Sequence, residues 1–428
     1  MARKMKDSGI EWIGEIPEGW EVIPAKFLFK NSDIRRIVDD EQLTSSQQFG
    51  IISQKDYTEL TGSKVVLANK GLADWKHVEP FDFIISLRSF QGGLEMSEIT
   101  GCITWHYIVL KPCHKICSYY YKWLFKSDSY IRALQRTCSF IRDGQDLRYS
   151  NFIQVPLFEP PLAEQEKIAD YLNADCPRID AMLTKTRSSI EEYKKLKQTV
   201  ITQAVTKGVR GEREMKDSGV ECIGKIPTTY SICKLKYLLK NPLKYGANES
   251  GIPYSDSLPR YIRITDITPD GNLKCTGKLS LSEESAKDYI LEDGDILFAR
   301  SGATVGKTFI YYQSYGRSAY AGYLIKASLN NKVSPKFVYY YTCSSLYEIW
   351  KNSIFIQSTI QNIGADRYAN LPVPVPKTLQ EQEEIADYLD ATCAEIDKLI
   401  AKKEQLVKEL ESYKKSLIYE VVTGKREV

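Results

Sequence analysis

The chain has 428 residues, of which 43% are hydrophobic and 26% are charged, and its formal net charge is +3. This length predicts two to four domains, and the composition is that of a soluble globular protein rather than a polycation. No uncharged apolar run approaches the roughly 18 residues of a membrane span, and the first residues, MARKMKDSGIEW, contain no apolar signal segment. We therefore expect a cytoplasmic protein.

An internal repeat predicts the order of the domains. Residues 5–17 read MKDSGIEWIGEIP and residues 215–227 read MKDSGVECIGKIP, identical at ten of thirteen positions. EQEKIADYL, at 164–172, returns as EQEEIADYL at 381–389. We expect two variable domains, each followed by a helical region, with the boundaries 1–161, 162–211, 212–377 and 378–428.

Each variable block predicts an α+β domain with a mixed, mostly antiparallel sheet, because β-forming segments alternate with helical ones. The expected strands lie at residues 65–68, 81–87, 104–111, 151–160, 261–267, 294–300, 307–312 and 321–327, and the expected helices at 117–127 and 334–351. The segment DFIISLRS, starting at Asp82, aligns with DILFARS, starting at Asp295. Trp12 and Trp20 are expected to pack within the first domain.

The helical regions predict a coiled coil. Thr378 and Glu381 form a capping box, and we expect a short helix to end near Asn173 and near Asp390 before a longer one begins. The predicted seam positions are Ile396, Lys403, Leu410 and Leu417 with Leu399, Leu406 and Tyr413, and, in the first copy, Ile179, Thr186, Tyr193 and Val200 with Met182, Ser189 and Leu196. The helices either pair with each other in antiparallel fashion or pack separately on their own domains.

The stretch FARSGATVGKTFIY, at 298–311, resembles a phosphate-binding loop but fails its pattern. A P-loop needs four residues between its glycines, and here three separate Gly302 from Gly306. The segment after Lys307 is β-branched and aromatic, which predicts a strand and not the helix that a phosphate cradle needs. We expect a hairpin whose Arg, Lys, Ser and Thr side chains suit phosphates and base edges.

We find no catalytic motif and no metal site. The three histidines, His77, His106 and His114, all lie in the first half, and no H-E-x-x-H or G-x-S-x-G pattern occurs. The only clustered cysteines, Cys113 and Cys117, lack the second Cys/His pair of a structural zinc site, so we expect free thiols.

Four motifs resemble the specificity subunit of type I restriction-modification systems. They are DSGIEWIGEIPEGW, GDILFARSGATVGK, EQ-x-x-I-A-x-Y-L at the start of each helical region, and YKKSLIYEVVTGK near the C-terminus. The resemblance covers essentially the whole chain. It implies two target-recognition domains, separated by two helical regions that pair as an antiparallel coiled coil, and no catalysis by this chain.

The resemblance also implies the partners, in a bacterial cytoplasm. Each domain would read one half of a bipartite, asymmetric site on double-stranded DNA. Two modification subunits, which bind S-adenosylmethionine and methylate adenine, and restriction subunits, which use ATP and Mg²⁺ and cut DNA, would supply all cofactors. The alternative is a coiled-coil adaptor that binds only protein.

The candidate DNA-binding residues are polar or basic and lie beside predicted strand ends. The 58 Lys and Arg and 28 Tyr can form a local basic, aromatic surface despite the small net charge. In the first domain they are Lys55, Arg88, Ser89, Gln91, Arg142, Gln145 and Arg148, and in the second they are Arg263, Arg300, Ser301, Thr304, Lys307, Gln357 and Arg367.

Overall fold

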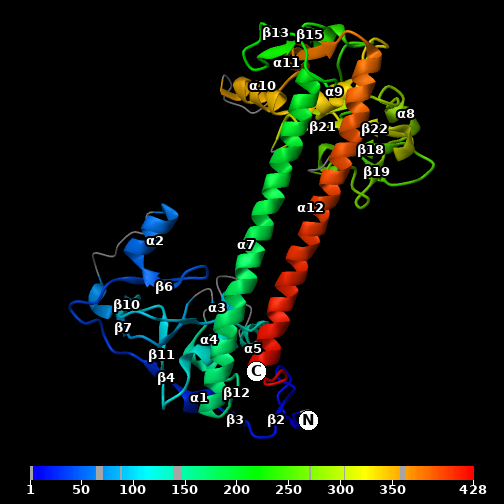
Figure 1. The fold of residues 1–428 in the computed structure, drawn as a ribbon. Helices are drawn as coiled ribbons and strands as arrows, with labels where there is room; N and C mark the ends of the chain where they lie inside the picture. Colours follow the sequence, from blue (N-terminus) through cyan, green and yellow to red (C-terminus); the bar gives the residue numbers. More distant parts are fainter. Residues whose placement is uncertain are drawn as a thin grey trace. The chain divides into compact units, whose positions relative to one another are not determined.

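The computed structural model describes residues 3–63, 71–86, 89–137, 147–268, 271–302, 304–356 and 362–428. Two compact units make up the chain (Figure 1). The first unit consists of residues 1–187 and 405–428, and the second of residues 188–404. Both are α+β, which confirms the predicted fold class.

The elements of the first unit precede the first long helix. They are β1 (Met5–Asp7), β2 (Glu15–Pro17), β3 (Glu21–Ile23), α1 (Ala25–Leu28), β4 (Phe29–Ser32), β5 (Leu43–Ser46), β6 (Gly50–Ser53), α2 (Gln54–Thr61), η1 (Leu72–Asp74), β7 (Lys76–Val78), β8 (Phe83–Ile85), α3 (Ser89–Gly92), β9 (Glu95–Met96), β10 (Gly101–Ile103), β11 (Ile108–Pro112), α4 (Ser118–Lys126), α5 (Asp128–Arg136), α6 (Tyr149–Phe152) and β12 (Leu157–Glu159).

The second unit repeats this plan between the two long helices. Its elements are β13 (Met215–Asp217), β14 (Lys225–Pro227), β15 (Tyr230–Lys234), η2 (Leu235–Tyr237), β16 (Lys244–Tyr245), β17 (Ile252–Pro253), β18 (Arg260–Ile262), η3 (Ile264–Asp266), β19 (Leu279–Ser280), α8 (Glu283–Ala286), β20 (Ile296–Ala299), β21 (Thr308–Ile310), η4 (Gln313–Tyr315), β22 (Ser318–Tyr320), β23 (Leu324–Ala327), α9 (Pro335–Thr342), α10 (Ser345–Ile356), α11 (Ala365–Ala369) and β24 (Pro372–Pro376). The long helices are α7 (Leu162–Lys207) and α12 (Leu379–Val422).

The same central sheet occurs in both units. Its strand order is β4-β11-β8-β9 in the first and β16-β23-β20-β21 in the second, with antiparallel pairing throughout. The second unit adds the sheet β17-β19-β18-β22, in which β18 and β22 are parallel. The strand predicted at 65–68 lies outside the described residues. The sequence repeat thus encodes one sheet twice, with additions between its strands.

Asp82 and Asp295 occupy equivalent turns, as their alignment predicts. Each carboxylate accepts a hydrogen bond from the backbone N–H three residues earlier, at 2.8 Å in both units. Each also pairs with a lysine of the neighbouring strand, at 2.9 Å for Lys111 and 3.5 Å for Lys326. Two different sequences therefore enter β8 and β20 through the same turn.

The repeated Glu-Gln dipeptide joins each long helix to its domain. Gln165 accepts a hydrogen bond from the backbone N–H of Cys117 at 2.9 Å, and Gln382 accepts one from Ser334 at 2.8 Å. Each of these two side-chain amides also donates to the carbonyl of a proline just before the helix. Since both glutamines are buried, these bonds fix the start of the helix against the domain.

The neighbouring glutamates make a second matched contact. Glu164 accepts a hydrogen bond from the indole N–H of Trp20 at 2.9 Å, and Glu381 accepts one from the hydroxyl of Tyr230 at 3.1 Å. Thr378 caps the backbone N–H of Glu381 at 3.4 Å, but the carboxylate turns to Tyr230, so only half of the predicted capping box forms. The same carboxylates form ion pairs with the arginines that precede each repeat, Arg3 and Arg213.

Each long helix is continuous, so the predicted breaks near Asn173 and Asp390 are wrong. Buried Leu172, Cys176 and Ile179 follow one another at spacings of four and three through the first expected break. This spacing keeps one apolar face turned to the domain. Packing of that face maintains the helix where local capping signals suggest an end.

The long helices pair in antiparallel fashion, which confirms the predicted coiled coil. In the first unit Lys414 contacts Asp180 at 2.6 Å and Glu411 contacts Arg187 at 2.5 Å. In the second unit Asp397 lies 2.7 Å from Lys197. The residue numbers of the contacting residues decrease along α12 as they increase along α7, as antiparallel helices require.

Half of the predicted seam is wrong. The positions Ile396 and Leu417 are buried, as expected, but the predicted partners Leu399, Leu406 and Tyr413 are exposed. The inward positions lie one residue later, at Ile400, Val407 and Lys414 in α12 and at Leu183 and Ile190 in α7. The apolar face of α12 is wider than the seam, so an exposed apolar stripe remains beside it.

Candidate DNA-binding surface

The stretch FARSGATVGKTFIY forms a β-hairpin. Strands β20 and β21 pair antiparallel, with Phe298 opposite Thr308. Backbone bonds between Ala299 and Lys307, at 2.8 Å, and between Gly306 and Ala299, at 2.9 Å, close its base. Gly302 and Gly306 both have positive φ, near 80° and 83°. Because Thr308 begins a strand, no helix N-terminus follows the glycines, and the loop is not a nucleotide cradle.

Two buried tyrosines support the base of this hairpin. The hydroxyl of Tyr368 donates to the carbonyl of Ala299 at 2.8 Å, and that of Tyr347 donates to the carbonyl of Gly306 at 2.7 Å. Both rings are fully buried. The tip of the hairpin is therefore presented from a fixed base.

Arg300 is the first residue of the hairpin tip, and it stacks on an aromatic ring. Its guanidinium carbon lies 5.0 Å from the ring centroid of Tyr245, which is 41% exposed. The Tyr245 hydroxyl is held by the backbone N–H of Ala365 at 3.0 Å. Among the described residues Arg300 has no carboxylate partner, and its Nε makes no hydrogen bond. The positive charge is thus oriented but not neutralised.

The other predicted residues of the second unit differ in how far they remain available. Ser301, Thr304 and Lys307 are half-buried at the hairpin tip, and Arg367 is exposed on α11. Arg263 forms a two-bond pair with Asp266, at 3.0 and 2.8 Å. Its charge serves a local turn, so it is a poorer candidate than Arg300. Gln357 lies outside the described residues.

The equivalent hairpin of the first unit joins β8 to β9 through α3. Ser89 is buried, and its hydroxyl accepts the backbone N–H of Ser86 at 2.8 Å. It therefore shapes the turn and does not face solvent. Lys55 is exposed on α2, and Arg148 is exposed just before α6. Arg88, Arg142, Gln145 and the side chain of Gln91 lie outside the described residues.

Two exposed aromatic residues beside the hairpins were missed in the sequence analysis. Trp105 is 56% exposed just before β11, and Tyr323 is 63% exposed just before β23. In the sheet, Ile108 pairs with Ile85 at the end of β8, and Leu324 pairs with Ala299 at the end of β20. Each aromatic residue therefore lies at the edge from which its hairpin projects. The sequence feature that could have identified them is an aromatic residue in the turn just before a predicted strand.

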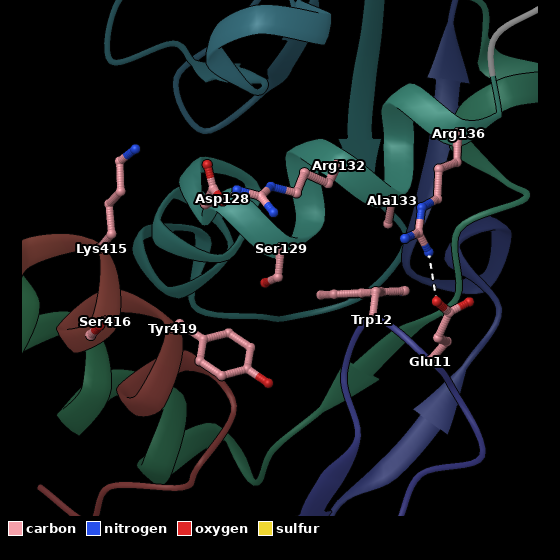
Figure 2. Close-up of a pocket in the computed structure, with 10 residues that line it drawn as sticks. All are labelled: Glu11, Trp12, Asp128, Ser129, Arg132, Ala133, Arg136, Lys415, Ser416 and Tyr419. Atoms are coloured by element: carbon pink, nitrogen blue, oxygen red, sulfur yellow. Dashed lines mark hydrogen bonds and ion pairs between the residues drawn. The ribbon is translucent and has the colours of Figure 1, made fainter. Parts of the chain in front are cut away.

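A cavity of about 360 Å³ lies in the first unit and is lined in part by α5 (Figure 2). The ring of Trp12 lines it, and the indole N–H makes no hydrogen bond with any described residue. Glu11 forms an ion pair with Arg136 at 3.0 Å at one side, as Figure 2 shows. Trp12 packs against Tyr130 and Phe158, and Trp20 is fully buried. Both tryptophans therefore pack the domain, as predicted.

Neither a metal-binding cluster nor a helix that could span a membrane occurs in the described ranges. There, no three His, Cys, Asp or Glu side chains gather as a metal site requires. Every described cysteine is free of a disulfide, as predicted. No helix in the described part of the chain is long and apolar enough to cross a bilayer.

Comparisons with known proteins point to one family. Residues 251–409 match the type I restriction modification DNA specificity domain. The chain is 25% identical over 288 residues to the type I restriction enzyme MjaVIII specificity subunit of Methanocaldococcus jannaschii, a match over 64% of this chain and 62% of that protein, less than two thirds of its length. It is 26% identical to the putative MjaX specificity subunit of the same organism, over 96% and 95% of the two chains.

Solved structures share the fold. A chain from a structure on complex assembly and conformational transition of the type I R-M system superimposes with a TM-score of 0.69 at 15% identity, over 95% of this chain and 98% of that one. The HsdS subunit from Thermoanaerobacter tengcongensis gives a TM-score of 0.53 at 14% identity, over 96% and 98%. The two-unit plan with long helices is therefore an established architecture.

Proposed function

Because the chain belongs to the family of type I restriction-modification specificity subunits, we propose that it reads a bipartite, asymmetric site on double-stranded DNA and itself catalyses nothing. Each unit recognises one half of the site through its hairpin and neighbouring loops. Two modification subunits, carrying S-adenosylmethionine, methylate adenine beside the recognised bases. Restriction subunits, with ATP and Mg²⁺, join the same complex.

The observation that carries this proposal is one sheet built twice with different hairpins. The strand order, the Asp82 and Asp295 turns and the glutamine anchors match between the units. The tips do not match, since β8 and β9 are joined through α3 and β20 and β21 through a Gly-rich loop. A central sheet shared by both units, with different hairpin ends, suits the recognition of two DNA half-sites with different sequences.

The electrostatics of the hairpin support DNA as the ligand. Arg300 is unpaired among the described residues and stacked on Tyr245. By contrast, Arg317 in the same unit makes a two-bond pair with Glu283, at 2.6 and 2.8 Å. A planar, oriented guanidinium suits the major-groove edge of guanine, whose O6 and N7 accept two hydrogen bonds.

The helical pair supports a scaffolding role. Leu406 and Tyr413 lie seven residues apart on α12 in the first unit and are exposed, as is Met182 on α7 in the same unit. An exposed apolar stripe on a soluble protein is typical of a surface that a partner covers. We propose that helices of the modification subunits cover it.

Mapping of adenine methylation in the host genome, with and without this chain, tests the proposal. We expect an interrupted motif that disappears when the chain is deleted and that has different sequences in its two halves. A continuous palindrome would contradict two different recognition domains. Duplex binding with a flat salt dependence would instead favour the protein-only adaptor, since phosphate contacts release counterions.

A further inference from the structure

The two units carry the same exposed lysine–aromatic pair, at positions related by the repeat. Residues 24–30 read PAKFLFK and residues 234–240 read KLKYLLK. Phe27 is 58% exposed and Tyr237 is 67% exposed. Lys26 and Lys236 each lie 5.1 Å from the centroid of the adjacent ring. Neither ring contributes to a core, so fold stability does not explain an aromatic residue in both places.

The backbone around both pairs is fixed in the same way. The backbone N–H of Cys113 donates to the carbonyl of Leu28 at 2.8 Å, and that of Asn330 donates to Leu238 at 2.9 Å. Leu28 and Leu238 are buried beside the exposed rings. The rings therefore project from equivalent turns of the two units.

The charge around the rings is also repeated. Lys26 and Lys30 are exposed in the first unit, and Lys236 and Lys240 in the second. Among the described residues, one of the four lysines, Lys240, has an ion-pair partner, Glu292, at 3.3 Å between two exposed side chains. Exposed surface pairs of this kind are weak, so both patches keep a basic rim around an aromatic centre.

From this repetition we infer that Lys26–Phe27 and Lys236–Tyr237 are two copies of one protein-docking surface, each of which binds one modification subunit through an apolar socket with an acidic rim. The inference rests on the proposed function. Aromatic residues are enriched at protein interfaces, where they lie inside a polar rim and contribute much of the binding energy. Recognition of two unlike half-sites would need unlike residues, whereas two copies of one subunit need the same residues twice.

Stoichiometry tests the inference. The full chain is mixed with the modification subunit, and the complexes are weighed by native mass spectrometry. We expect two modification subunits on the wild-type chain, one on Phe27→Ala or Tyr237→Ala, and at least a tenfold weaker affinity for both sites in the double variant. Phe27→Tyr and Tyr237→Phe should restore both sites. Tyr254→Ala removes another exposed aromatic residue that lies beside a lysine, with Lys278 5.1 Å from its ring centroid, and should keep two subunits.

Other outcomes overturn the inference in distinguishable ways. If the double variant binds two subunits with wild-type affinity and methylates the same motif, the docking surface is refuted while the proposed function stands. If Lys26→Ala with Lys30→Ala only reduces the salt dependence of DNA binding, the patch binds phosphates and the inference is wrong. If the wild-type chain binds no modification subunit, both the surface and the proposed function fail.

Discussion

Arg300 stacks on Tyr245, with its guanidinium carbon 5.0 Å from the ring centroid. A cation above an aromatic face is attracted by the ring quadrupole, and the buried Nε of Arg300 makes no hydrogen bond with any described residue. The two residues come from neighbouring parts of one sheet, since β16 and β20 both pair with β23. The hairpin therefore carries an arginine whose guanidinium lies against the face of Tyr245.

Replacement of Arg300 should weaken specific DNA binding. We expect Arg300→Ala to raise the Kd of the assembled complex for its target duplex about 10- to 100-fold, because a two-bond contact to a base contributes about 1–3 kcal/mol. Arg300→Lys should not restore it, since an ammonium neither stacks nor donates from a fork. Fluorescence anisotropy with labelled duplex measures both variants.

The matched control is Arg317→Ala. Arg317 is an exposed arginine of the same unit whose charge is already paired with Glu283. Its loss should leave the Kd within about twofold of the wild type. Equal effects of the two substitutions would show that Arg300 acts only through net charge.

Lys307 should contribute a phosphate contact and not nucleotide hydrolysis. Lys307→Ala should reduce the slope of log K against log salt by about 1, because one fewer counterion is released. The comparison is Lys402→Ala, an exposed lysine on α12, for which we expect an unchanged slope. ATP hydrolysis by the isolated chain that disappears with Lys307 would restore the P-loop interpretation that the hairpin geometry excludes.

Trp105 and Tyr323 should each affect one half of the recognised motif. They lie beside the hairpins of different units and are exposed. Exposed aromatic rings can stack on bases or pack against thymine methyl groups, contacts that an alanine lacks. Methylation mapping should show relaxed sequence in one half for Trp105→Ala and in the other half for Tyr323→Ala. Relaxation of the same half by both would contradict the assignment of one half to each unit.

Much of the fold could be predicted because the sequence consists of two related halves. Period-two segments located β8, β11, β20, β21 and β23. Half of the predicted coiled-coil seam was wrong because Leu399 and Leu406 are as apolar as their neighbours Ile400 and Val407. When two adjacent residues are both apolar, the sequence does not show which of them the other helix buries. Only the packed helices identify Ile400 and Val407 as the inward positions.

The candidate hairpin could be predicted in part, while its contacts with DNA stay a prediction. Arg300 and Lys307 stand out because they flank Gly302 and Gly306 just after a predicted strand, where the two glycines indicate a turn. The sequence has 28 tyrosines and does not distinguish the exposed Tyr245 and Tyr323 from the fully buried Tyr347 and Tyr368. Exposure depends on tertiary packing, which an aromatic letter does not reveal. The neutralisation of Arg263 by Asp266 is likewise a matter of geometry.

Glu381 should be a major source of stability in the second unit. It is buried, forms an ion pair with Arg213, and accepts a hydrogen bond from Tyr230 at 3.1 Å. Glu381→Ala leaves a largely buried arginine and a buried hydroxyl without their partner, which should cost about 3 kcal/mol. Urea unfolding of the full chain measures the loss. Glu384→Ala, which breaks an exposed pair with Arg210, should cost much less, and equal losses would refute the role given to burial.

The pH dependence of stability should differ in sign between two glutamates of the first unit. Burial raises the pKa of Glu95, although Lys126 beside it opposes the shift. The folded state therefore holds this proton more tightly than the unfolded chain, and ionisation lowers stability as the pH rises above about 4.3. The Glu95→Gln variant should have the same melting temperature as the wild type near pH 4 and a higher melting temperature than the wild type at pH 7.

Glu79 supplies the opposite control. Its hydrogen bond and charge contact with Lys111 lower the pKa of its carboxyl. Ionised Glu79 therefore stabilises the folded state above its ordinary pKa, and this contribution is lost as the pH falls through the lowered value. Glu79→Gln should consequently melt below the wild type at pH 7, with the difference shrinking under acid conditions. Because the two carboxylates differ in burial and both lie near a lysine, shifts of the same sign in both variants would mean that proximity to lysine, and not burial, governs Glu95.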